Sequence, residues 1–202
     1  MRAIQTPHGP ARVTFRTCDE PRAALVLGHG AGGGVGAPDL VAAADAALSE
    51  RVTVALVEQP YRVAGRRSPA PAHQLDAAWV AVLRELRNDG LAGLPLVAGG
   101  RSSGARVACR TAAETGAVGV LCLAFPLRPP TRQGGAERPS RVEELDAVAV
   151  PVLVVQGSRD PFGVPPPGPN RRVAEVEGNH SLRTGLEAIR GEIGAWLREL
   201  LS

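Results

Sequence analysis

The chain has 202 residues, the usual size of a single domain, and 44% of them are hydrophobic, which is enough to bury a core. The formal net charge is +3 and the basic residues form no run interleaved with aromatics, so the composition gives little support to nucleic-acid binding. No apolar stretch approaches the roughly 20 residues of a membrane span and the first residues lack the apolar core of a signal peptide, so we expect a cytoplasmic protein with no membrane segment.

Short apolar runs alternate with amphipathic segments along the chain, which is typical of a parallel sheet covered by helices on both faces. Apolar spacing predicts helices over 39–49, 75–86 and 182–200, an Ala-rich helix after residue 104, and one or two turns within 141–148. Segments rich in Pro, Gly or Arg predict loops at 60–71, 126–140 and 162–170. We predict one α/β domain over residues 1–202, with about seven strands at 12–16, 23–27, 52–57, 94–98, 118–125, 151–156 and 172–176. The first of these strands is expected to be outer and antiparallel.

Residues 97–108, VAGGRSSGARVA, place a G-x-S-x-G pattern between a buried strand and a helix. Such a turn holds one serine in a strained conformation at the carboxyl edge of the sheet. The residues two before and two after that serine must be tiny, because strand and helix nearly touch there. Gly100 and Gly104 flank Ser102 in this way, whereas an arginine would occupy the first of these positions around Ser103. The pattern therefore predicts Ser102 as a nucleophile.

A serine nucleophile needs a base to accept its proton, and the base needs a partner that holds its tautomer. Of the four histidines, His180 alone follows both the serine and a carboxylate at a strand end, that of Asp160. We place His8 in a frayed terminus and His73 at the solvated start of a helix. The chain order Ser102, Asp160, His180 is the order found in α/β-hydrolases, so these three residues are the predicted catalytic set.

The glycine-rich loop at 28–34 and the start of the helix after Ser102 each offer a backbone N–H group to a developing oxyanion. The predicted donors are those of Ala31 and Ser103, and His29 is interpreted as fixing the loop through hydrogen bonds to backbone. The loop lacks the Gly-Lys-Ser/Thr of a P-loop and the well-placed acid of a dinucleotide motif, which argues against nucleotide binding. The three cysteines have no C-x-x-C spacing, so we expect neither a metal nor another cofactor.

Four residues near strand ends are candidate substrate contacts: Tyr61, Phe125, Arg128 and Phe162. Arg128 and the arginines within 62–67 either bind a carboxylate-bearing substrate or are solvated loop residues, and the sequence leaves both interpretations open. Residues 126–140 are too few for a cap that closes a deep acyl tunnel. We therefore expect a monomer or small homo-oligomer that hydrolyses small carboxylic esters or thioesters.

Nearly the whole chain resembles the α/β-hydrolase superfamily, and more narrowly the KANL3/Tex30-type, dienelactone-hydrolase-like group of small hydrolases. The resemblance implies an α/β-hydrolase fold with little or no cap and Ser102, Asp160 and His180 as the triad, without implying a substrate. Where this group commonly has Tyr-Pro-Leu-His-Pro-Pro, the chain has Phe-Pro-Leu-Arg-Pro-Pro, so any role of that histidine is absent. The segments that carry the resemblance are HGAGGG (29–34), QPYRVAGRRSPAP (59–71), LDAAW (75–79), GGRSSGARV (99–107), FPLRPP (125–130), QGSRDPFG (156–163) and GNHSL (178–182).

The resemblance also supplies an alternative function, because similar proteins include subunits of regulatory complexes. In that interpretation the chain is a catalytically weak interaction subunit, and the loops at 65–71 and 126–140 bind a partner. A strained serine turn would have no use in such a subunit, which favours the enzyme.

Overall fold

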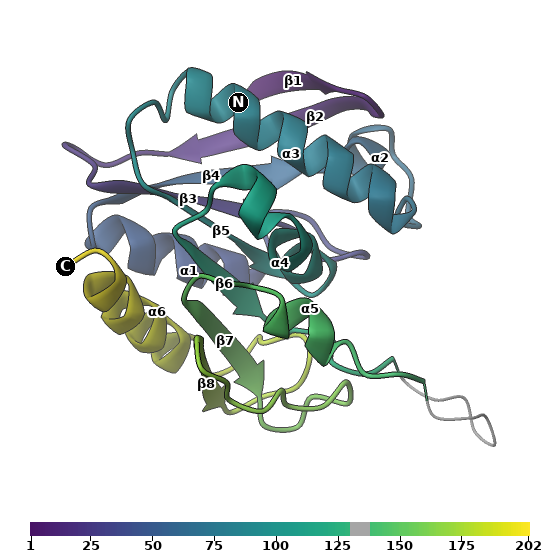
Figure 1. Ribbon diagram of the computed structural model, residues 1–202, viewed down its shortest axis with the longest axis vertical. Helices are drawn as coiled ribbons and strands as arrows, with labels where there is room; N and C mark the ends of the chain where they lie inside the picture. Colours follow the sequence, from purple (N-terminus) through teal and green to yellow (C-terminus); the bar gives the residue numbers. More distant parts are fainter. Residues whose placement is uncertain (130–137) are drawn as a thin grey trace.

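The computed structural model describes residues 1–129 and 138–202, in which eight strands form one sheet with helices on both faces (Figure 1). The strands, in chain order, are β1 (Arg2–Thr6), β2 (Gly9–Arg16), β3 (Ala23–Gly28), β4 (Val52–Glu58), β5 (Leu96–Arg101), β6 (Gly119–Leu123), β7 (Val152–Gly157) and β8 (Arg171–Val176). The helices are α1 (Pro38–Ser49), α2 (Pro60–Val63), α3 (Ala72–Asn88), α4 (Ser103–Thr115), α5 (Val142–Asp146) and α6 (Leu186–Leu200). The predicted α/β architecture is confirmed.

The strands lie in the order β1-β2-β4-β3-β5-β6-β7-β8, and those from β4 to β8 in this order are all parallel. β2 pairs with β4 in antiparallel fashion, as predicted for residues 12–16, but it is not the outer strand, because β1 pairs with its other side, also antiparallel. The sequence analysis missed β1, whose pattern buries only its central residue, Ile4. The placement of His8 in a frayed terminus was therefore wrong, since His8 lies in the β1–β2 turn, where the Thr6 hydroxyl donates to the Gly9 carbonyl at 2.6 Å.

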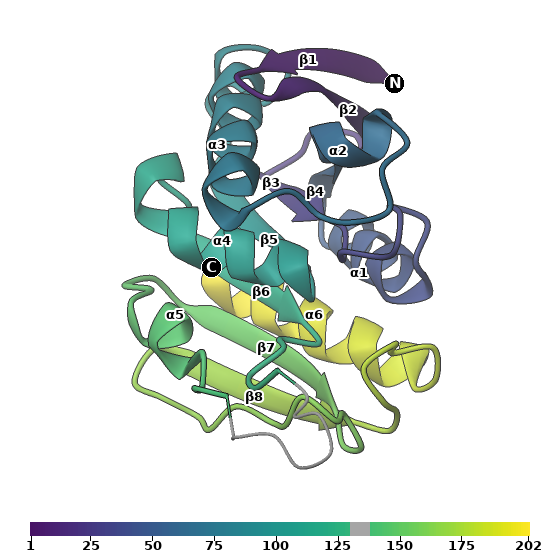
Figure 2. The same cartoon turned by 90° about the vertical axis from the view of Figure 1, so that its right-hand side faces the viewer.

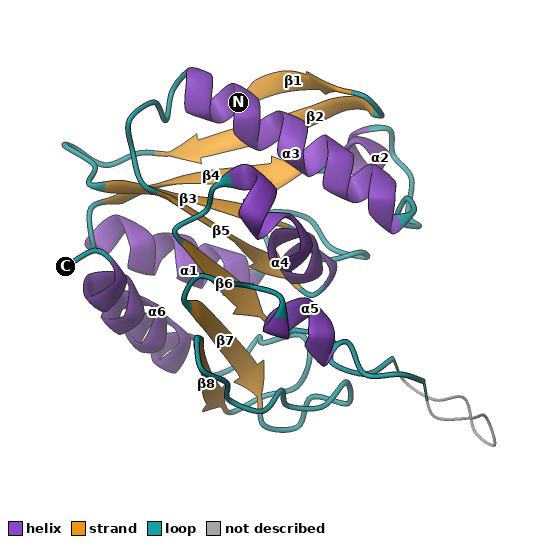
Figure 3. Ribbon diagram, viewed as in Figure 1, coloured by secondary structure: helices purple, strands orange, loops and turns teal. Residues whose placement is uncertain are grey.

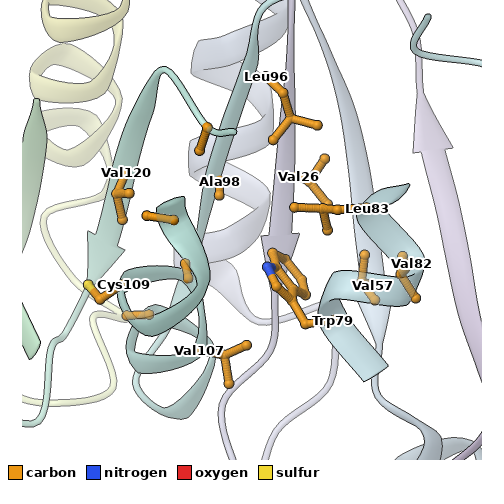
Figure 4. Close-up of a cluster of buried hydrophobic side chains, with 14 of the residues drawn as sticks. Val26, Val57, Trp79, Val82, Leu83, Leu96, Ala98, Val107, Cys109 and Val120 are labelled. Atoms are coloured by element: carbon orange, nitrogen blue, oxygen red, sulfur yellow. The ribbon is translucent and has the colours of Figure 1, made fainter. Parts of the chain in front are cut away.

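Helices α3, α4 and α5 cover one face of the sheet and α1 and α6 cover the other, and the sheet runs between these two layers in Figure 2. Burial on both faces explains why the inner strands are continuous apolar runs: all six residues of β3 are buried. On the first face, Trp79 and Leu83 of α3 point toward Val26 of β3 (Figure 4).

Because strands and helices alternate along the chain, the parallel strands all run in the same direction, and their carboxyl ends lie at the same edge of the sheet (Figure 3). β3 and β5 are neighbours, but the chain passes from β3 to β4 on one side and from β5 to β6 on the other. A crevice opens outside the carboxyl ends of two such strands, and ligands bind there in open α/β sheets. The glycine-rich loop after β3 and the serine turn after β5 both lie at this point. No helix among the described residues has both the length and the apolar content to cross a membrane.

Candidate active site

Ser102 lies between the end of β5 and the start of α4 with φ 52° and ψ −108°. A positive φ is uncommon for a residue with a side chain, and such strain persists only where the surrounding structure enforces it. The close packing that enforces it involves Gly28, Gly100 and Gly104. A Cβ on Gly104 would lie 2.5 Å from the Gly28 carbonyl oxygen, and one on Gly100 would lie 2.6 Å from the same atom. The requirement for tiny residues on both sides of Ser102 is therefore present in the structure.

Gly104→Ala is expected to lower the free energy of unfolding by about 3 kcal/mol, because the added methyl group meets backbone atoms that cannot move aside. The matched control is Gly191→Ala in α6, where an added Cβ meets nothing within 4 Å. That variant is expected to gain about 1 kcal/mol from better helix propensity. Urea unfolding of both variants measures the difference. Equal stabilities would contradict the close packing at the serine turn.

The structure connects the three predicted catalytic residues by hydrogen bonds, although they come from three separate loops. His180, after β8, has its Nε2 atom 2.9 Å from the Ser102 hydroxyl oxygen. Its Nδ1 atom lies 2.8 Å from Oδ2 of Asp160, which follows β7. The Asp160 side chain has no exposed surface and that of His180 is 20% exposed. This geometry allows a proton to pass from the serine hydroxyl to the imidazole while the carboxylate holds Nδ1–H in place.

Gln156, the fifth residue of β7, is a site residue that the sequence analysis did not identify. Its Nε2 atom donates to Asp160 Oδ2 at 2.8 Å and to the carbonyls of Phe125 and Gly163 at 3.1 and 3.0 Å. The Phe162 N–H donates to the other carboxylate oxygen at 2.9 Å. Asp160 thus has three donors around it and one orientation that satisfies them. The available signal was a fully buried amide inside an otherwise apolar strand, four residues before the acid.

His29 fixes the glycine-rich loop, as the sequence predicted. The Gln59 N–H donates to His29 Nε2 at 3.1 Å, so the ring proton lies on Nδ1, which donates to the Gly30 carbonyl at 2.8 Å. Burial lowers the pKa of His29, and this favours the neutral ring that these two bonds require. The Tyr61 hydroxyl donates to the Ala31 carbonyl at 3.0 Å and supports the same loop.

The four candidate substrate contacts occupy different environments. Phe125 has no exposed surface and belongs to the core, so its expected place in a pocket wall is corrected. Tyr61 is buried beside a cavity of about 70 Å³ that includes none of the three linked residues. Phe162 lies beside His180, with ring centroids 4.3 Å apart. Arg128 is exposed and lies beside the loop that carries Phe162, because its backbone N–H donates to the Phe162 carbonyl at 2.9 Å.

An open groove of about 490 Å³ lies beside the glycine-rich loop, and none of the three linked residues lines it. The glycine-rich loop forms one wall, and Arg101, Ser181 and Arg183 line it as well. Arg101 and Ser181 are the chain neighbours of Ser102 and His180, which places the groove close to the site.

A mostly parallel sheet that carries a strained serine after β5, bonded to a histidine and through it to a carboxylate, defines the class of α/β hydrolases. A family model described as the alpha/beta hydrolase domain matches residues 21–183, and the chain belongs to this family. No curated protein matches the sequence. The wider resemblance drawn from the sequence is thereby confirmed, and the KANL3/Tex30-type subgroup stays a prediction.

Solved structures share the fold over nearly their whole length. A lidless α/β serine hydrolase from Xanthomonas campestris has 19% sequence identity and a TM-score of 0.75, with 98% of this chain and 93% of that chain covered. A dienelactone hydrolase from Anabaena variabilis has 14% identity and a TM-score of 0.76, covering 98% and 95%. The esterase domain of a Rhodothermus marinus protein has 15% identity and a TM-score of 0.70, covering 100% and 98%. At these identities the likeness concerns the fold.

Proposed function

We propose that the protein is a serine hydrolase of small carboxylic esters or thioesters, with Ser102 as nucleophile, His180 as general base and Asp160 as the group that orients it. The observation that carries this proposal is the continuous hydrogen-bonded chain from Ser102 Oγ through the imidazole to the buried carboxylate, at 2.9 and 2.8 Å. The lidless serine hydrolase and the esterase domain among the structural relatives support the same chemistry.

In the first half of the reaction, Ser102 Oγ bonds to the ester carbonyl carbon while its proton moves to His180 Nε2. The bond to the leaving alcohol or thiol then breaks, and His180 returns the proton to the departing oxygen or sulfur. In the second half, water gives a proton to His180 and attacks the acyl carbon. The bond from this carbon to Ser102 Oγ then breaks, and His180 returns the proton to Oγ as the acid leaves. Asp160 accepts the Nδ1–H of His180 and stabilises the imidazolium that forms in each half.

The oxyanion of the tetrahedral intermediates needs two donors, and we assign them to the backbone N–H groups of Ala31 and Ser103. Ser103 is the first residue of α4, and the first N–H groups of a helix have no partner within it. Ala31 lies in the loop held by His29 and Tyr61. The removal of one such donor typically costs about 3 kcal/mol of transition-state stabilisation.

Small acyl groups are the expected substrates because the groove beside the site is open. We expect kcat/KM for a p-nitrophenyl ester series not to rise from acetate toward octanoate. Longer chains find no enclosing apolar wall, so they gain no binding energy for their extra methylene groups. Measurement of kcat/KM along the series tests this. A rise with chain length would show that the acyl group binds in an apolar tunnel.

The interaction-subunit alternative makes a different prediction for a fluorophosphonate probe. Such a probe labels a working nucleophile, and it leaves a folded protein with an inert serine unmodified. Several probe sizes and a heat-denatured control separate an inert serine from a closed site. Of the two loops named in this alternative, residues 65–71 are described, whereas residues 130–137 of the second lie outside the described part of the chain.

A further inference from the structure

Arg101, the residue before the proposed nucleophile, connects three segments that form the site. Its Nε atom lies 2.9 Å from Oδ2 of Asp39, and its Nη2 atom donates to the His180 carbonyl at 2.8 Å. The Arg101 side chain is 15% exposed and that of Asp39 has no exposed surface. An exposed ion pair contributes little, but here the partners are largely withdrawn from water and the guanidinium bonds to backbone as well.

Asp39 gives this arginine a rigid attachment. It lies in the first turn of α1, and its other oxygen accepts the Leu40 N–H at 3.0 Å. Burial raises the pKa of Asp39, and the Arg101 guanidinium acts against this shift. Because arginine stays protonated, removal of its charge would leave a buried carboxylate without a counter-charge.

The guanidinium also lies over Gly30, at the start of the loop that carries Ala31. A Cβ on Gly30 would approach Arg101 Nη1 to 2.8 Å, so the arginine occupies the space that a side chain would fill. The His180 loop has mostly local bonds of its own: Asn179 accepts from the backbone N–H groups of Ser181 and Leu182. The Arg101 bond therefore ties this loop to β5.

From these contacts we propose that Arg101 is a positioning residue, which holds the His180 loop and the glycine-rich loop against the serine turn through its ion pair with Asp39. This inference rests on the proposed function. Arg101 does not touch the reacting atoms. It fixes the main chain from which the imidazole projects, so that Nε2 stays within hydrogen-bonding distance of Ser102.

Arg101→Met is expected to lower kcat by up to about 100-fold with little change in KM, because a displacement of about 1 Å between reacting groups has that effect. Arg101→Lys should recover part of the loss, since an ammonium group reaches one of the two partners but not both. The matched control is Arg110→Met. Arg110 lies on α4, away from the serine, and pairs with Asp76 through two bonds at 2.6 and 2.8 Å and with Glu144 at 3.4 Å. That variant should lose stability and keep kcat.

Guanidinium rescue gives a readout that general destabilisation would not produce. The groove beside the site reaches Arg101, so a small cation has a route to the space left in Arg101→Ala. Millimolar guanidinium chloride should raise kcat of this variant several-fold, and sodium chloride at equal ionic strength should not. Neither salt should raise kcat of the wild type. Wild-type kcat in a folded Arg101→Met variant would overturn the proposal, as would equal rescue by both salts.

If Arg101→Ala does not fold, the double variant Arg101→Met with Asp39→Asn removes both charges and avoids a buried unpaired carboxylate. Hydrogen exchange then tests the same inference without activity: residues 29–34 and 179–182 should exchange faster than in the wild type, with β7 unchanged. Unchanged exchange in both loops would contradict the positioning role. An inactive, unlabelled wild type would instead contradict the proposed function, so the two failures are distinguishable.

Discussion

Ser102→Ala is expected to lower kcat for p-nitrophenyl acetate by on the order of 10⁶-fold, because the variant has no atom that can form the acyl-enzyme. The remaining rate would come from the oxyanion donors and substrate binding alone, since members of such a triad act as one unit. The fold should persist: alanine is smaller than serine, and the packing that enforces the strained turn comes from Gly100 and Gly104. Steady-state kinetics and a urea unfolding curve on the same preparation measure both effects.

Ser49→Ala is a suitable control for this experiment. Ser49 is exposed at the end of α1, and its hydroxyl bonds only to the carbonyl of Asp45 among the described residues. It should keep wild-type kcat. Peptide mapping after fluorophosphonate treatment should place the adduct on Ser102 and not on the neighbouring Ser103. An adduct on Ser103, or a Ser102→Ala variant as active as the wild type, would refute the assigned nucleophile.

Local patterns in the sequence were sufficient to predict most of the fold. A strand buried on both faces is mainly apolar, so β3, β6 and, apart from Gln156, β7 could be recognised from composition alone. The serine turn could also be predicted from the sequence, because backbone contact restricts positions 100 and 104 to glycine whatever surrounds them. β1 escaped notice because an edge strand buries a single residue and therefore shows no clear period. The short α2 was missed in a segment where Pro and Arg indicated a loop.

The contacts that support the site were harder to predict from the sequence, because they join residues that lie far apart in it. Arg101 meets Asp39 across 62 positions, and although Arg101 lies within the serine turn, nothing in the sequence near either residue indicates this partner. Tyr61 was predicted to contact substrate, but it lines a cavity that includes none of the three linked residues, and its hydroxyl bonds to the carbonyl of Ala31, a pairing set by how α2 packs beside the loop. Phe125 follows a strand end, as a pocket residue would, yet its side chain turns into the core. A position at a strand end predicts a location near the site, and tertiary packing decides which way the side chain points.

Asp160→Asn is expected to lower kcat by about 10⁴-fold while keeping the shape of the site. The carboxylate accepts from the Phe162 N–H on one oxygen and from His180 and Gln156 on the other. An asparagine supplies one accepting oxygen and one donating nitrogen. The Phe162 N–H is a fixed backbone donor, and Gln156 keeps its bonds to the Phe125 and Gly163 carbonyls when it loses this one, so the amide oxygen should face Phe162 and the amide nitrogen should face the imidazole. His180 must then accept at Nδ1 and carry its proton on Nε2, where it can no longer take the proton of Ser102.

Nitrogen NMR of the histidine ring provides a direct test, because the Nδ1–H and Nε2–H forms of neutral imidazole are distinguishable. The His180 signals should change from the first form to the second in Asp160→Asn, in parallel with the loss of kcat. Asp76→Asn is the matched control, since it alters a paired carboxylate outside the site. It should leave both the His180 tautomer and kcat unchanged. If Asp160→Asn retained wild-type kcat with the wild-type tautomer, another group would have to orient His180, and the bond between Asp160 and the imidazole would have no part in the reaction.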